Sequence, residues 1–281
     1  MSEKSPVILW LRRDLRLGDH PALQAAMACG GPVIPVYIRD ELVDGLGAAP
    51  KWRLSLSLES LAKDLAAKGS KLILRSGPAM EVLKFIIEET GAKTVHWHRA
   101  YDPDSIARDT GVKTALKDAG IAAESHAGHL LFEPGTVQTG SGGFYKVYSP
   151  MWKAVRGREV ALPLDAPATI PAPETWPASE PQEDWALGAA MNRGADVCLP
   201  YQRVGEAAAL ERMHHFVDQM IAGYDTQRDF PAVDGTSGLS ENLSLGEISP
   251  RTCWHAGQRA LAEGKAGAET WLKELVWREF A

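Results

Sequence analysis

The chain has 281 residues, about two domains of ordinary size. Hydrophobic residues make up 45% of it and charged residues 23%, and this globular composition excludes a disordered, collagen-like or coiled-coil protein. The formal net charge of −6 excludes a global basic field that would attract nucleic acid, so any nucleic-acid site must be local.

Strand and helix patterns alternate over residues 1–133. Asp19 and Pro21 predict the N-cap and first turn of a helix that runs to Ala28. The other predicted helices cover residues 51–67, 79–89 and 102–118, and the predicted strands cover residues 7–11, 32–38, 72–74, 94–97 and a stretch within 121–132. Because the strands are apolar on both faces, we predict a Rossmann-like, doubly wound α/β domain with a parallel five-stranded sheet.

The alternation ends at Glu133. Six of the 18 prolines lie between Pro163 and Pro181, which predicts a long extended connector because proline donates no backbone hydrogen bond. Helical periodicity returns at Gly205 and is followed by short helices. We therefore predict an α/β domain over residues 1–133, a connector over 134–204 and the beginning of an all-α domain over 205–281.

The last predicted helix covers residues 269–281. Trp271, Glu274, Trp277 and Arg278 lie within an arc of about 120° on it, and leucine and valine occupy the adjoining arc. Such a helix needs to be buried, yet little chain follows to bury it. We expect either that another chain covers it or that the natural protein continues, and we favour continuation.

Three features near the sheet have ordinary structural interpretations. Arg12, Arg13 and Arg16 around Asp14 replace the glycine-rich loops of dinucleotide and P-loop sites, and we expect a buried salt-bridge network there. His96 and His98 face one way in a strand, but no third ligand is near in sequence, so we predict hydrogen-bonded histidines and no metal site. Three separated cysteines indicate a reducing, cytoplasmic location without a disulfide framework, and no run is long and apolar enough to cross a membrane.

Two stretches further along the chain have the composition of ligand sites. The run Thr236, Ser237, Gly238, Leu239 and Ser240 precedes a short predicted helix, where hydroxyl and backbone N–H donors suit a phosphate. The alternative is an ordinary Ser/Thr N-cap. Glu274 lies between two tryptophans and suits the edge of a nucleobase, with an ion pair to Arg278 as the alternative.

Six motifs occur in an order that together is specific to one family, although none is specific alone. They are LWLRRDLRLGD at 9–19, LLFEPG at 130–135, YKVYSPMW at 145–152, RDFP at 228–231, TSGLS at 236–240 and WLKELVWREF at 271–280. With these motifs the chain resembles the cryptochrome/photolyase family over essentially its whole length, and within it the bacterial cyclobutane pyrimidine dimer (deoxyribodipyrimidine) photolyases.

The resemblance implies a light-dependent DNA repair lyase that splits pyrimidine dimers in UV-damaged DNA by electron transfer from excited, reduced FAD. It implies an α/β domain for an antenna chromophore, a folate or a deazaflavin whose identity stays open, and a protein that is monomeric at full length. Carried over to this sequence, the flavin contacts are Tyr224, Thr236, Ser237, Gly238, Leu239, Ser240 and Trp271. Arg228, Glu274, Trp277 and Arg278 are implied to meet the DNA, with Glu274 and Trp277 as the catalytic pair.

Two other functions remain open at this point. A cryptochrome-type light sensor shares the family, but the resemblance favours repair because animal-type cryptochromes have glutamine at the position of Glu274. A non-catalytic α/β nucleotide-binding module with a docking helical tail is the other alternative. Because the helical domain of the family extends beyond the position of Ala281, we expect these 281 residues alone to bind FAD weakly and to repair nothing.

Overall fold

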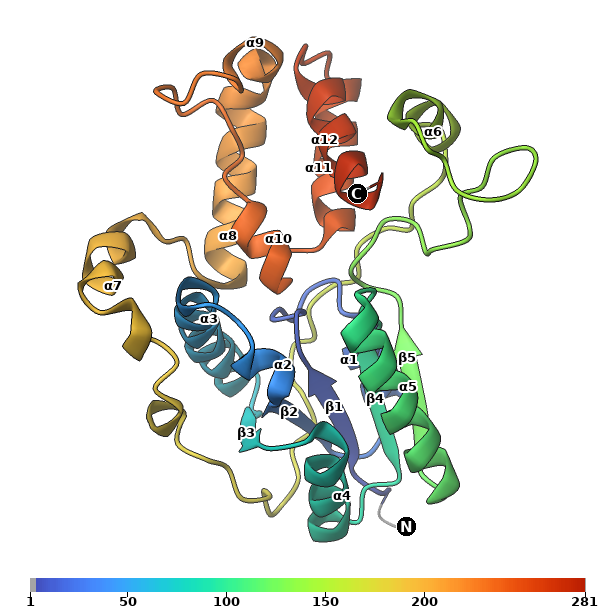
Figure 1. The fold of residues 1–281 in the computed structure, drawn as a ribbon, viewed down its shortest axis with the longest axis vertical. Helices are drawn as coiled ribbons and strands as arrows, with labels where there is room; N and C mark the ends of the chain where they lie inside the picture. The colour runs from blue at the N-terminus through green and yellow to red at the C-terminus, as the bar shows by residue number, and fades with distance from the viewer. Residues whose placement is uncertain (1–3, 281) are drawn as a thin grey trace.

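The computed structural model describes residues 4–280 and contains one parallel sheet of five strands (Figure 1). The strand order β3-β2-β1-β4-β5 places β1 in the centre, and the chain winds outward from it in both directions. This arrangement confirms the predicted doubly wound α/β fold. The strands are β1 (Val7–Leu11), β2 (Val33–Arg39), β3 (Ile73–Ser76), β4 (Thr94–His98) and β5 (Ala122–His126).

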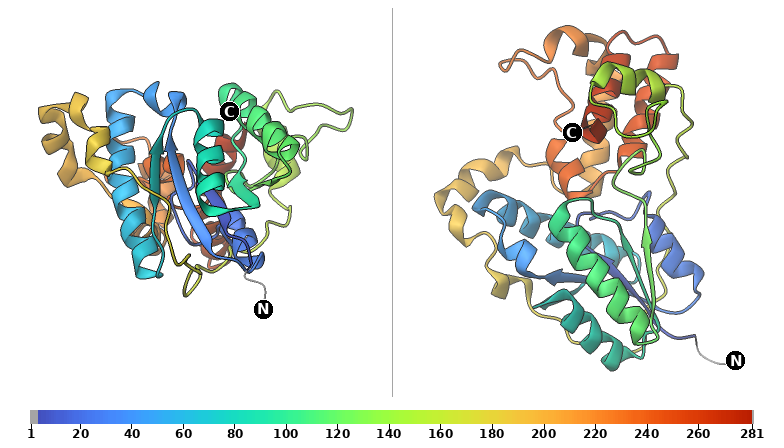
Figure 2. Two further views of the ribbon diagram at one scale, coloured as in Figure 1. Left: turned by 90° about the horizontal axis from the view of Figure 1, so that it is seen from below. Right: turned by 45° about the vertical axis from the view of Figure 1, so that its right-hand side comes forward.

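Helices cover both faces of the sheet (Figure 2). The side chains of β1 alternate between two separate cores, because successive residues of a strand point to opposite faces. Leu9 belongs to the core under α1 (Pro21–Ala28) and α3 (Ala48–Ala67), and Trp10 belongs to the core under α4 (Ala79–Thr90) and α5 (Pro103–Asp118). The short helix α2 (Glu41–Asp44) follows β2.

One local expectation about this domain is wrong. The N-cap of α1 is His20, whose Nδ1 accepts a hydrogen bond from the backbone N–H of Leu23, whereas Asp19 has a φ of +46° and its carboxylate binds Arg251. The fifth strand, Ala122–His126, lies within the predicted stretch. Beyond it the N–H groups of Leu131 and Phe132 donate to the Glu279 carboxylate at 2.9 and 3.3 Å.

The connector runs along the surface in the extended form that its prolines predict. It contains α6 (Tyr148–Val155), the 3₁₀ turns Gln182–Trp185, Ala189–Met191 and Leu199–Tyr201, and α7 (Arg193–Cys198). Between α6 and the first 3₁₀ turn it has no helix or strand, and backbone bonds hold it against β2 and β3. The N–H of Val33 donates to Pro171, and that of Glu180 donates to Leu74. The predicted domain boundaries stay predictions.

The remaining chain is helical, as predicted. It contains α8 (Gly205–His215), a π turn (Phe216–Met220), a 3₁₀ turn (Ile221–Gly223), α9 (Tyr224–Gln227), α10 (Ser240–Leu245), α11 (Pro250–Ala262) and α12 (Ala268–Phe280). Trp254 of α11, Trp271 of α12 and Phe216 of the π turn belong to one buried core. Among the described residues every helix is too short or too polar to cross a bilayer.

A buried ion pair joins the helical region to the α/β domain. The guanidinium of Arg53 on α3 binds both carboxylate oxygens of Glu247, at 2.6 and 3.0 Å, and Glu247 is fully buried. The N–H of Gly205 and the side chain of Asn242 donate to the same carboxylate at 2.9 and 2.6 Å. Beside it Gly246 lies so close to the backbone of Arg13 that a Cβ would meet the carbonyl oxygen at 2.0 Å. These contacts fix the helices against α3 and over the carboxyl end of β1.

Candidate functional site

A buried arginine on α8 shapes the hydroxyl-rich loop at residues 236–240. Arg212 donates to the carbonyl oxygens of Thr236 and Ser237 at 2.7 and 2.9 Å and pairs with Asp234 at 2.6 Å. The C=O and N–H of a trans peptide point in opposite directions, so the N–H groups of Ser237 and Gly238 point away from Arg212. Gly238 has a φ of +63°. Successive N–H groups in such a turn form a concave site suited to an anion.

The hydroxyls of this loop do not cap the helix that follows. Leu239 occupies the N-cap position of α10, and no side chain caps that helix. Within residues 4–280 the hydroxyls of Thr236, Ser237 and Ser240 have no hydrogen-bond partner. The N-cap alternative is therefore wrong, and these donors remain free for a ligand.

The loop at residues 236–240 and the last helix, α12, both contact the C-terminal end of α8 and the π turn that follows it. Phe216 follows Arg212 by one helical turn, and its ring lies 5.2 Å from that of Trp271 and 5.4 Å from that of Tyr224. Trp271 is only 3% exposed. Its indole is therefore a core residue in this structure, whereas the loop side of the same region is open.

The partner of Glu274 differs from the one expected. Its carboxylate forms an ion pair with Arg228, just after α9, and this contact raises the pKa of the Arg228 guanidinium. Arg278 donates instead to the carbonyl oxygen of His129 at 2.9 Å, so the predicted i,i+4 pair with Glu274 is wrong. Arg228 also lies over the ring of Tyr224 at 5.9 Å. Arg228 thus contacts two other predicted site residues, Tyr224 and Glu274.

Trp277 presents one covered and one partly open side. Its ring stacks on Tyr148 of α6 with centroids 3.8 Å apart and planes 7° from parallel, and 42% of the residue is exposed. Burial, with a smaller effect of Glu274, raises the pKa of Tyr148 to about 12, and its hydroxyl donates to the carbonyl of Lys273 at 2.6 Å. Sequence reasoning missed Tyr148 as a site residue, although it lies in one of the six motifs.

Asp14 forms a different cluster from the predicted arginine network. Its buried carboxylate lies 2.9 Å from Nδ1 of His98 and 3.4 Å from Nε2 of His20. The other nitrogen of each ring accepts a backbone N–H, from Ala22 and Leu23 respectively. The nitrogens that face Asp14 therefore carry the protons of two neutral imidazoles, and their contacts with the carboxylate are electrostatic, without the geometry of hydrogen bonds. Burial is the largest influence on the carboxyl and opposes ionisation, but the histidine contacts hold the pKa of Asp14 well below its usual value.

We expect His20 to make stability depend on pH. Burial lowers its folded pKa to about 4 from an ordinary 6.5, so the unfolded chain binds the proton first as the pH falls. Stability that is present above pH 6.5 is lost toward pH 4, by about 1.4 kcal/mol per pH unit. Asparagine at position 20 keeps an N-cap acceptor but does not titrate. In urea unfolding, His20→Asn should therefore weaken the pH dependence between pH 6 and 4.5 by about one proton, and an unchanged dependence would contradict this assignment.

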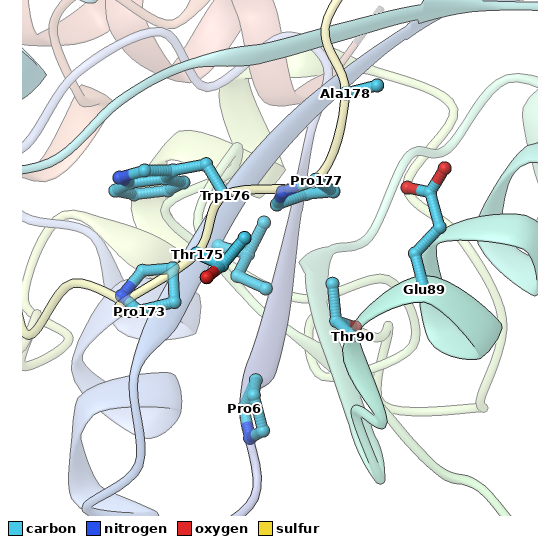
Figure 3. Close-up of a pocket in the computed structure, with 9 residues that line it drawn as sticks. Pro6, Glu89, Thr90, Pro173, Thr175, Trp176, Pro177 and Ala178 are labelled. Carbon is cyan, nitrogen blue, oxygen red and sulfur yellow. The ribbon is translucent and has the colours of Figure 1, made fainter.

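The described structure also has a cavity of about 360 Å³ away from the predicted flavin residues (Figure 3). The connector lies over it, and Trp176, Pro173 and Pro177 line it together with Pro6 and Glu89. The Glu89 carboxylate is already bound by Arg75 at 2.6 Å. Because the lining offers few free polar groups, this cavity lacks the converging donors of a catalytic site.

Together the fold and the site define a class of protein: a doubly wound α/β domain joined to a helical region with a loop of outward-facing hydrogen-bond donors. The family model described as DNA photolyase matches residues 7–174, and the chain belongs to this family. The predicted family is therefore confirmed.

The relatives agree with this assignment. The deoxyribodipyrimidine photo-lyase of Agrobacterium fabrum is 44% identical over 98% of this chain and 58% of its own length. The protein of the same name from Synechococcus sp. PCC 6301 is 34% identical over 98% of this chain and 59% of its own length. The crystal structure of a bacterial class III photolyase from Agrobacterium tumefaciens has a TM-score of 0.91 at 43% identity and covers 100% of this chain and 58% of that one. The chain thus spans somewhat more than half the length of these relatives.

Proposed function

We propose that this chain provides the α/β domain and the phosphate end of the flavin site of a light-dependent DNA repair lyase. The substrate in this proposal is a cyclobutane pyrimidine dimer in UV-damaged DNA. The observation that carries it is the loop at residues 236–240, whose carbonyl oxygens Arg212 holds inward while its donors face outward. The Agrobacterium and Synechococcus relatives support the reaction class because both are named deoxyribodipyrimidine photo-lyases.

The donors of the loop fit the diphosphate of FAD. Ser237 and Gly238 would offer backbone N–H groups, and Thr236 and Ser240 would offer hydroxyls, to phosphate oxygens. Tyr224, Trp271 and Leu239 would support the cofactor from the helical core behind the loop. When bound in its reduced form, FAD supplies the light-excited electron that splits the cyclobutane ring. A folate or deazaflavin antenna on the α/β domain belongs to the same proposal.

The exposed face beside Glu274 suits a base extruded from damaged DNA. A damaged pair stacks poorly, so its extrusion costs less than that of a normal pair. Trp277, already stacked on Tyr148, would offer its open side to the dimer, and Glu274 would hold the dimer by a hydrogen bond. Arg228, released from Glu274, would bind the DNA backbone, and Arg278 would stay close to the lesion by its bond to the His129 carbonyl.

We expect Glu274→Ala to reduce light-dependent repair strongly and Glu274→Gln to keep part of it, because only glutamine retains a hydrogen-bonding group. The assay follows loss of a single thymine dimer from duplex DNA under blue light, with the protein as its gene encodes it and reduced FAD present. Glu269→Ala provides the matched control, since Glu269 lies on the same helix and pairs with Lys273 at 3.3 Å. Full repair by Glu274→Ala would show that Glu274 has no role in the reaction.

A further inference from the structure

Two histidines and a glutamate meet at the edge of the sheet, away from the proposed flavin loop. His96 comes from β4, and Glu124 and His126 come from the edge strand β5. Nδ1 of His96 lies 2.9 Å from Nε2 of His126 and 3.9 Å from a carboxylate oxygen of Glu124. All three atoms lie within 4.8 Å of one another. The strand register explains this, because His96 is opposite Glu124 and residues two apart in a strand share a face.

A neighbouring thiol orients the first of these rings. Cys29, at the end of α1, lies with its Sγ 3.6 Å from Nε2 of His96, and the same thiol donates to the carbonyl of Ala25 at 3.5 Å. Since the thiol proton is directed to Ala25, the sulfur accepts the Nε2 proton of His96. That tautomer leaves the Nδ1 lone pair directed at His126 and Glu124. A partner that fixes the remote ring nitrogen in this way is typical of metal-binding histidines.

The hydrogen bond between the two rings also suits a cation. Nδ1 of His96 accepts the Nε2 proton of His126, so its lone pair is directed into the cluster. The Asp14 cluster differs, because there the nitrogens that face the carboxylate carry protons and backbone N–H groups occupy the others. In the His96 cluster, metal binding requires only that one proton move from Nε2 to Nδ1 of His126, because this proton lies between the two rings.

We propose that His96, Glu124 and His126 bind a divalent first-row transition-metal ion of the Zn²⁺ class. Two nitrogen ligands and one carboxylate match the ligand types of Zn²⁺, and the fourth position would hold water. Tetrahedral Zn–N bonds place ligand atoms about 3.3 Å apart, so the histidines need to separate by only a few tenths of an ångström. Glu124, with 60% of its side chain exposed, leaves a path for the ion. The bound ion would fasten the edge strand β5 to β4.

The test uses protein without a histidine tag, stripped by a chelator and titrated with Zn²⁺ alone against a chromophoric competitor. We expect one equivalent to bind, and His126→Gln and Glu124→Gln each to weaken the affinity at least tenfold. Cys29→Ala should weaken it by roughly 10- to 100-fold through loss of the orienting contact. His214→Gln, an exposed histidine on α8, is the matched control and should bind like the wild type.

Three results would overturn the proposal. The first is a wild-type affinity no higher than that of the His126→Gln, Glu124→Gln double variant. The second is an equal loss in His214→Gln, which would indicate nonspecific binding by surface histidines. The third is full binding by His126→Gln together with none by Cys29→Ala, which would place the ion on the thiol. Circular dichroism of each variant checks that the fold is retained. The double variant is a suitable reference because Glu124 is exposed and His126 is half-buried, so neither substitution disturbs the core.

Discussion

Replacement of Glu247 by alanine is expected to lower the free energy of unfolding by about 3–5 kcal/mol, because it removes the buried counter-ion of Arg53 and leaves only the exposed carboxylate of Glu241, 3.5 Å from Nε of Arg53. The pair joins residues 194 positions apart and connects α3 to the turn between α10 and α11. The same substitution removes the acceptor of the Gly205 N–H and of the Asn242 side chain. Urea unfolding followed by tryptophan fluorescence measures the loss.

Glu59→Ala is the matched control for this measurement. Glu59 also pairs with a basic residue, Lys63, at 2.8 Å, but both side chains are more than half exposed. Exposed pairs contribute about 0–1 kcal/mol, so the control should change stability little. A loss below about 1 kcal/mol for Glu247→Ala would mean that solvent reaches Arg53 and that the two regions are not joined by a buried charge pair.

Arg212→Met is expected to reduce the affinity for FAD at least tenfold. Methionine fills similar space but donates no hydrogen bond, so the carbonyl oxygens of Thr236 and Ser237 lose their partner and the outward N–H groups lose their fixed direction. Isothermal titration with FAD measures the change. Arg212→Lys keeps the positive charge but lacks the planar guanidinium group with its several donors, so it should give an intermediate loss of FAD affinity.

Arg259→Met controls for the removal of a positive charge. Arg259 lies on α11 with 57% of its side chain exposed and makes only a long contact, 3.9 Å, to Glu263. It should bind FAD like the wild type. If Arg212→Met kept the wild-type affinity and a native circular dichroism spectrum, the loop at 236–240 would not be a phosphate site.

The α/β fold could be predicted because its signals are local. All five residues of β1 are buried, so an apolar run without alternation correctly indicated a central parallel strand. The proline spacing identified the extended connector for the same reason.

The incorrect details involve partners distant in sequence. Glu274 binds Arg228, 46 residues away, rather than Arg278 on its own helix. Asp14 pairs with His98 rather than with the arginines beside it. Helical and strand periodicity carry no information about such contacts. The two-residue spacing of Glu124 and His126, matching that of His96 and His98, was the one local signal of the edge-strand cluster.

The most direct test of the central claim compares FAD with riboflavin in the same titration of the wild-type chain. Riboflavin has the flavin ring but no phosphate, so it cannot use the donors of residues 236–240. If the loop binds the diphosphate, FAD binds weakly but at least tenfold more tightly than riboflavin, and Arg212→Met removes that difference. Equal affinities for FAD and riboflavin would contradict the proposed flavin site.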